Sequence, residues 1–200
     1  MQTRTLFPVA ALAAVLVGGG LLLAGPQEKG EPSEQDAMMA EWMKAAQPGE
    51  HHAHLGKMAG TWKAQTRHWM QPGAEAQVTE GKATFKPVLG GRFIQSTFEG
   101  DFMGQPFHGV GFSGYDNIRA KHVDVWMDSM GTQITQSEGI CEEGGKVVKM
   151  TGQFVDPTGA SQSMRMITRE TGPSSVVFEM YGPDPKGTEY KMMEITYTRM

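Results

Sequence analysis

The sequence predicts an all-β fold: a closed antiparallel up-and-down β-barrel of about ten strands, preceded by a short N-terminal helical segment. Glycine is abundant, with 26 residues, and short runs rich in Val, Thr, Phe, Tyr and Trp alternate with turn signals. Short links make neighbouring strands antiparallel. Gly109, Gly111 and Gly114 fall inside one predicted strand, as in a sheet that must curl. Closure is expected because it removes exposed strand edges.

The segment from Val88 to Thr132 is the densest in glycine, aromatic and short polar residues, and it predicts three central strands. These are residues 92–100, 105–116 and 121–130. The remaining predicted strands are 60–69, 77–86, 132–139, 146–154, 164–170, 175–181 and 190–199. Turn signals such as Asp156-Pro157-Thr158-Gly159 separate them.

The N-terminal region differs in composition from the rest. Residues 1–25 hold one arginine before an apolar run from Leu6 to Leu23, which predicts a signal peptide or an uncleaved N-terminal anchor. Residues 26–49 are expected to be a linker and an amphipathic helix capped by Ser33, and residues 50–200 the barrel. The protein is therefore expected to be exported, either periplasmic or secreted, and to meet a membrane only through the leader.

The charge and cysteine content exclude several classes of function. The net charge is −4 and basic residues do not cluster, so nucleic acid is not an expected partner. Cys141 is the only cysteine, so neither an intrachain disulfide nor a zinc–thiolate site is expected to form. His51, His52 and His54 invite a metal interpretation, but adjacent helical residues point apart, and surface histidines are the preferred interpretation.

Strand alternation identifies candidate interior residues. Within 121–130, His122, Asp124, Trp126 and Asp128 share one face of the strand. A tryptophan between two aspartates is unusual for solvent, so we expect Trp126 and Asp128 to line the interior. A buried carboxylate needs a partner, and Arg92 is the first candidate, with Arg165 second.

Several motifs together resemble a bacterial family of unknown function. They include His54-Leu55 before Gly60-Thr61-Trp62, Leu89-Gly90-Gly91-Arg92-Phe93, Gly114-Tyr115-Asp116-Asn117, Trp126-x-Asp128-Ser129 and Met193-Glu194-Ile195-Thr196-Tyr197. This pattern resembles the domain-of-unknown-function family 1579 over residues 50–200. The resemblance implies a lipocalin-like barrel, a member of the lipocalin/calycin group, and supplies no activity.

The sequence favours a binding protein for a small apolar or amphipathic ligand. The residues expected to line its site are Trp62, Arg92, Phe93, Phe107, His108, Tyr115, Trp126, Asp128 and Met166. No P-loop, nucleophile elbow or dinucleotide-binding motif is present, so an enzyme is not the preferred interpretation. The alternatives are a non-covalent haem or metal protein using His68 or His108, an enzyme with Asp128 or His108 as base, and a filled scaffold. The sequence identifies no cofactor.

Overall fold

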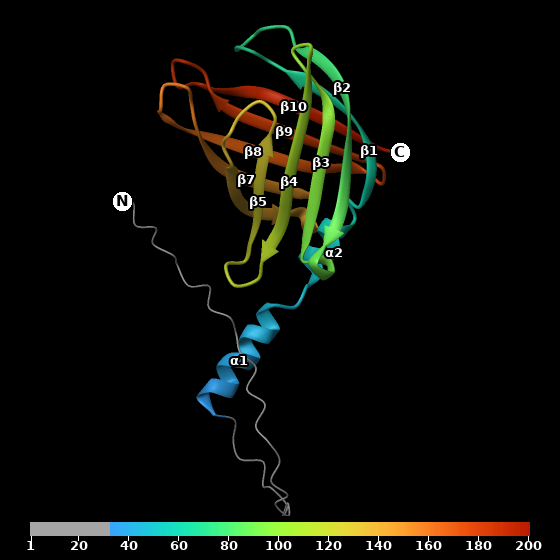
Figure 1. Ribbon diagram of the computed structural model, residues 1–200, viewed down its shortest axis with the longest axis vertical. Helices are drawn as coiled ribbons and strands as arrows, with labels where there is room; N and C mark the ends of the chain where they lie inside the picture. The colour runs from blue at the N-terminus through green and yellow to red at the C-terminus, as the bar shows by residue number, and fades with distance from the viewer. Residues whose placement is uncertain (1–32) are drawn as a thin grey trace, which may run out of the picture.

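The structure is a computed structural model that describes residues 33–200, and it consists of a β-barrel with two helices before it (Figure 1). The helices are α1 (Glu34–Ala45) and α2 (Glu50–Gly56). The strands are β1 (Gly60–His68), β2 (Gln77–Val88), β3 (Phe93–Phe102), β4 (Gln105–Asp116), β5 (Lys121–Asp128), β6 (Thr135–Glu142), β7 (Val147–Val155), β8 (Ser161–Gly172), β9 (Ser175–Pro183) and β10 (Glu189–Arg199).

The ten strands form a closed antiparallel meander, as the sequence predicts. Each strand pairs with its neighbour in the chain, and β10 pairs with β1 from Trp62 opposite Arg199 to His68 opposite Met193. No strand edge is left open in the sheet, which removes the template for edge-to-edge association. The predicted strand boundaries are correct to within a few residues: β5 ends at Asp128, and β6 begins at Thr135.

The register fixes which side chains face the interior. Trp62 lies opposite Ala83, Ala83 opposite Phe98, Phe98 opposite Gly109 and Gly109 opposite Asp128. Trp62 and Ala83 are each 2 % exposed, so this row of residues belongs to the inner face. Side chains two residues along each strand share that face. The inner face of β5 therefore carries His122, Asp124, Trp126 and Asp128.

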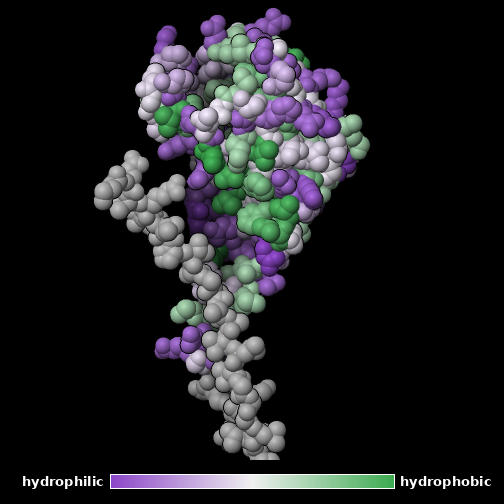
Figure 2. All heavy atoms as spheres, in the orientation of Figure 1, coloured by the Kyte–Doolittle hydropathy of each residue, from purple (hydrophilic) through white to green (hydrophobic). Residues whose placement is uncertain are grey.

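The outer faces of β4 and β5 are largely apolar. Phe112 lies opposite Val125, and Gly114 lies between Phe93 and Val123, on the face opposite to that of Trp126. Hydrophobic residues gather on the barrel face in view over β4 and β5 (Figure 2). The inner faces of these strands combine polar groups such as Ser113 and Asp124 with the ring of Trp126.

Two similar glycine turns lie at the barrel end near α2. The 3-10 turns η1 (Leu89–Gly91) and η2 (Glu143–Gly145) each contain two glycines at positive φ. At Gly145, φ is +92° and a Cβ would lie 2.9 Å from Nδ1 of His54. Glycine is required there both by the backbone conformation and by the close approach of α2.

Helix α1 begins at a capping box, in which Ser33 and Asp36 exchange hydrogen bonds. None of its side chains is buried, so the predicted apolar stripe does not pack on the barrel. Its C-terminal end is fixed instead through the backbone: Asn117 donates to the carbonyls of Ala45 and Gln47, each at 2.8 Å. Helix α1 extends away from the barrel, whereas α2 lies at one end of it (Figure 1).

Within residues 33–200, neither helix has both the length and the apolar content that a membrane span requires. The predicted signal peptide or anchor, residues 1–25, lies outside the described part of the chain.

Candidate functional site

Helix α2 directs its histidines toward the barrel. His52 is 6 % exposed, and its Nδ1 accepts a hydrogen bond from the backbone N–H of Gly49 at 3.0 Å. Nε2 of His54 lies 2.8 Å from a carboxylate oxygen of Glu170 on β8. The prediction of surface histidines is therefore wrong. A helix of seven residues is not stable by itself, and α2 is stabilised by the contacts that its histidines make with the barrel.

His51 lies at the centre of a cluster of rings and a thiol. Its ring stacks on Tyr115 of β4 with centroids 3.9 Å apart, and it meets His122 of β5 edge-on at 5.6 Å. Its Nδ1 lies 3.4 Å from Sγ of Cys141 on β6. Donor atoms of His51, His122 and Cys141 all lie within 4.8 Å of one another. We call these three residues the His–Cys cluster.

His122 is the most enclosed member of the His–Cys cluster. It is 3 % exposed, and its Nε2 has no hydrogen-bond partner among residues 33–200. Burial, reinforced by the neighbouring histidines His51, His54 and His52, lowers the pKa of His122 to about 4. The imidazole is therefore neutral at physiological pH and offers a nitrogen lone pair.

The inner wall continues from the His–Cys cluster along β4 and β5 with further polar groups. The hydroxyl of Ser113 donates to the carboxylate of Asp124 at 2.5 Å. Burial raises the pKa of Asp124 to about 6, despite that hydrogen bond. Burial and the nearby Asp124 also raise the pKa of Tyr197 on β10. One side of the interior thus holds a column of polar side chains beside aromatic ones.

Trp126 lies on the inner face, as predicted, and its Nε1 donates to Asp128 at 2.9 Å. Asp128 also accepts from the backbone N–H of Met130. The predicted Arg92–Asp128 pair is wrong. Arg92 donates to the carbonyls of Ala46 and Leu89. It lies just before β3, at the end of the barrel where β5 begins, whereas Asp128 is the last residue of β5.

The second candidate partner of Asp128 is also engaged elsewhere. Arg165 on β8 forms a two-pronged hydrogen bond to Glu189 at 3.1 and 2.7 Å. Its guanidinium also lies 4.1 Å from the ring centroid of Tyr181. The carboxylate of Asp128 therefore accepts hydrogen bonds from Trp126 and Met130, at the end of β5, and not from an arginine.

The structure divides the nine residues predicted to line the site. Six lie on the inner face: Trp62, Phe107, Tyr115, Trp126, Asp128 and Met166. Phe93 and His108 lie on the outer face and are exposed, so their predicted inward orientation is wrong. Arg92 is at the barrel end and holds the chain between α1 and α2. His68, the other histidine considered as a ligand, is on the inner face against Phe102.

Sequence reasoning missed the His–Cys cluster. A single cysteine predicts neither a disulfide nor a zinc–thiolate site, although one thiolate can join histidines from other elements. The available signal was alternation: β6 pairs with β5 so that Gly139 lies opposite His122, which places Cys141 on the same face two residues on. His51 could not be found in this way, because it lies on α2 and strand alternation does not predict where that helix packs.

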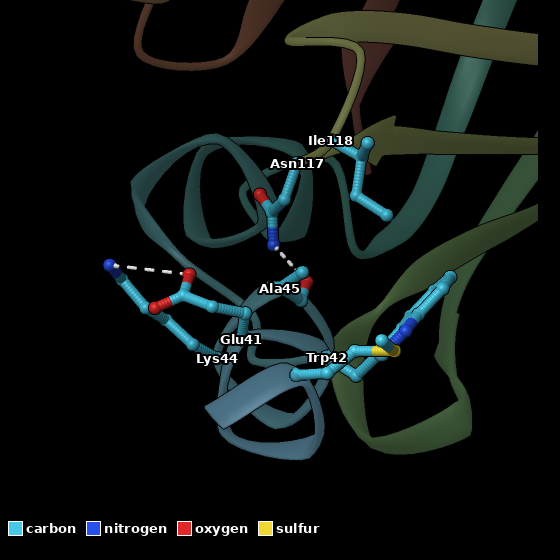
Figure 3. Close-up of a pocket in the computed structure, with 7 residues that line it drawn as sticks. Glu41, Trp42, Lys44, Ala45, Asn117 and Ile118 are labelled. Atoms are coloured by element: carbon cyan, nitrogen blue, oxygen red, sulfur yellow. Dashed lines mark hydrogen bonds and ion pairs between the residues drawn. The ribbon is translucent and has the colours of Figure 1, made fainter. Parts of the chain in front are cut away.

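A pocket of about 510 Å³ lies between α1 and the turn after β4 (Figure 3). Trp42 and Ile118 line it and are 60 % and 66 % exposed, so the pocket is open to solvent. Its polar groups are engaged: Asn117 holds the carbonyl of Ala45, and Glu41 faces Lys44 at 3.9 Å. The chemically distinctive groups of the molecule are on the inner face of the barrel and not here.

The profile of a family described as "Protein of unknown function (DUF1579)" matches residues 47–199. No curated protein matches the chain. Among solved structures, Rv2717c from M. tuberculosis aligns with a TM-score of 0.59 and 13 % identity, covering 77 % of this chain and 99 % of that one. A redesigned β-barrel aligns with a TM-score of 0.37 and 16 % identity, covering 74 % of this chain and 95 % of that one. The first alignment supports the barrel fold alone.

Proposed function

The chain belongs to the DUF1579 family, whose function is unknown, and we propose that its barrel binds a small amphipathic molecule in the interior. One observation carries the proposal: several large side chains on the inner face remain partly accessible to solvent. They are Phe85, Phe98, Trp126, Met166 and Phe178. An interior filled by its own side chains would bury them. Aromatic and methionine side chains with few polar groups are typical of ligand pockets.

The polar groups of the wall favour a particular head group. Within the described residues, Asp124 has one hydrogen-bond donor, Ser113, and a carboxylate can accept several. Burial of that carboxylate is costly unless it is paired. A ligand with an amine or hydroxyl at one end would supply the missing donor, while its apolar part would contact Trp126 and Met166. We therefore propose an amphipathic ligand with a basic or neutral donor head, not a fatty acid.

Three twelve-carbon compounds test this proposal: dodecylamine, dodecanol and dodecanoate. We expect the amine to bind with a Kd in the micromolar range, about −8 kcal/mol, and dodecanoate to bind at least about tenfold more weakly. Asp124→Asn should reduce the preference for the amine by about tenfold. Glu99→Gln changes the same charge on the outer face, where Glu99 is exposed, and should leave all three affinities unchanged.

Calorimetry gives the affinities, and tryptophan fluorescence reports the position of the ligand. Trp126→Phe keeps most of the apolar volume, so this variant should bind with a smaller fluorescence change. If none of the compounds binds up to its solubility limit, the interior is not a ligand site. If dodecanoate binds more tightly than dodecylamine, the assigned role of Asp124 is wrong.

We also propose that the protein is exported, because of the apolar run from Leu6 to Leu23. Fusion of residues 1–40 to a reporter that is active only outside the cytoplasm should give activity. The same fusion with Leu21, Leu22 and Leu23 changed to arginine should be inactive, because charges interrupt the apolar run. A stable fusion of the natural sequence without activity would reject the export proposal.

A further inference from the structure

Three elements bring potential metal ligands to one point at the α2 end of the barrel. His51 comes from α2, His122 from β5 and Cys141 from β6, and a donor atom of each lies within 4.8 Å of the other two. The sequence separation is large, so local chain geometry does not explain the convergence. It arises because α2 lies at the end of the barrel where β5 begins and β6 ends.

The distances already approach those of a metal centre. Zinc binds sulfur at about 2.3 Å and imidazole nitrogen at about 2.0–2.1 Å in a tetrahedron, which places two such ligands about 3.5 Å apart. Sγ of Cys141 and Nδ1 of His51 are 3.4 Å apart. The donor atom of His122 lies within 4.8 Å of the other two, so it needs to move by no more than about 1.3 Å to reach a tetrahedral separation.

A second observation also indicates a ligand. Nε2 of His122 is buried without a hydrogen-bond partner in the described chain, although the residue is only 3 % exposed. An unpartnered buried nitrogen costs free energy, and such groups are rare in folded proteins. A cysteine–histidine pair alone would account for the contact between His51 and Cys141, but it would leave His122 unexplained. A shared cation accounts for all three groups.

We propose that His51, His122 and Cys141 bind one divalent transition-metal ion, with zinc as the natural candidate. Two imidazoles and one thiolate form a borderline-soft donor set, which prefers zinc, cobalt(II) or copper to magnesium or calcium. Three protein ligands leave a fourth coordination position for water or a small ligand, as in catalytic rather than structural zinc sites.

Tyr115 fixes the orientation of the His51 ring. The stacked ring, with centroids 3.9 Å apart, holds the imidazole plane of His51, and Tyr115 also contacts His122 edge-on at 5.0 Å. Tyr115 therefore acts as a positioning residue for both histidines. The bound ion would also join α2 to the barrel wall, so metal should stabilise the fold by linkage.

Cobalt(II) tests the site directly, because the chain contains one cysteine and any sulfur-to-cobalt charge-transfer band must come from Cys141. Full-length protein is reduced, stripped with chelator and titrated with Co²⁺. We expect one equivalent to give that band together with the intense visible bands of tetrahedral cobalt. Zinc should then displace the cobalt and bleach both sets of bands, and zinc should raise the melting temperature.

The variants separate this site from other histidines. Cys141→Ser should abolish the charge-transfer band, and His51→Asn or His122→Asn should weaken cobalt binding by at least about tenfold. His68→Asn and His108→Asn remove histidines outside the cluster and should bind as the natural protein does. Circular dichroism of each metal-free variant checks that the barrel is folded.

Three outcomes would overturn the proposal: no cobalt bound, cobalt bound without a sulfur band, or equal affinity in Cys141→Ser. If a ligand variant does not fold, the spectrum of the natural protein still decides, because Cys141 is the one cysteine in the sequence and no other residue can give the sulfur-to-cobalt band. The inference does not rest on the proposed ligand function. Dodecylamine binding measured on chelator-treated protein reports on that function separately.

Discussion

Replacement of Trp62 by alanine is expected to destabilise the barrel by about 3–5 kcal/mol. Trp62 is the largest side chain that is fully buried in the described chain, at 2 % exposure. Its Nε1 donates to the carbonyl of Met58 at 2.8 Å, and the guanidinium of Arg199 lies 4.2 Å from the ring centroid. Alanine would leave a cavity, an unpaired carbonyl and an unstacked arginine at the point where α2 leads into β1.

Urea and thermal unfolding measure this effect. A loss of that size lowers the melting temperature by roughly 6–20 °C for a domain of this length. Trp62→Phe keeps much of the volume but loses the N–H donor, so an intermediate loss of about 1–3 kcal/mol is expected. Trp42→Ala is the matched control, since Trp42 is 60 % exposed on α1 and its loss should change stability by less than about 0.5 kcal/mol. Equal effects at the two tryptophans would contradict this account of the core.

The barrel could be predicted from sequence because its determinants are local. Turn residues such as Asp156 and Gly159 separate the strands, and short links leave antiparallel pairing as the available geometry. The carboxylate of Asp156 accepts hydrogen bonds from the backbone N–H groups of Thr158 and Ala160, as is typical of an aspartate in a turn. The start of α1 at Ser33 could be predicted for the same reason, because a capping box involves residues only three positions apart.

The inner face was predicted correctly on β5, whereas on β4 it was wrong for His108. Val110 and Phe112 form the apolar face of β4, which suggested that His108 points inward. The inner face of that strand is instead Gly109 and Gly111, over which the ring of Trp126 lies. Glycine has no side chain, so it contributes no hydrophobic signal, and the pattern identified the outer face as the inner one.

The predicted partner of Asp128 failed because burial alone does not specify a partner. A buried carboxylate suggests a cationic partner, yet the neutral N–H donors of Trp126 and Met130 satisfy Asp128. The His–Cys cluster was missed for a related reason. Its members are far apart in sequence, and only the register of β5 with β6, together with the position of α2, brings them together.

Replacement of Gly109 by alanine is expected to cost about 1–3 kcal/mol by overpacking. A Cβ at Gly109 would lie 2.5 Å from Cη2 of Trp126 and closer still to Cζ2. The indole must therefore move, and its 2.9 Å hydrogen bond to Asp128 will be lost. Urea unfolding gives the cost, and a shift in tryptophan emission reports the displaced ring. Gly56→Ala is the control, because a Cβ there meets nothing within 4 Å.

The cause of this loss can be isolated, because the clash is with one side chain. In the double variant Gly109→Ala/Trp126→Leu the shorter side chain makes room, so the loss should be smaller than the sum of the single losses by at least about 1 kcal/mol. Gly139 offers the contrast: a Cβ there would lie 2.7 Å from the backbone carbonyl carbon of Lys149. Trp126→Leu should give no relief to Gly139→Ala, and the two losses should add. Additive losses for Gly109→Ala and Trp126→Leu would mean that the glycine is not there to accommodate the indole.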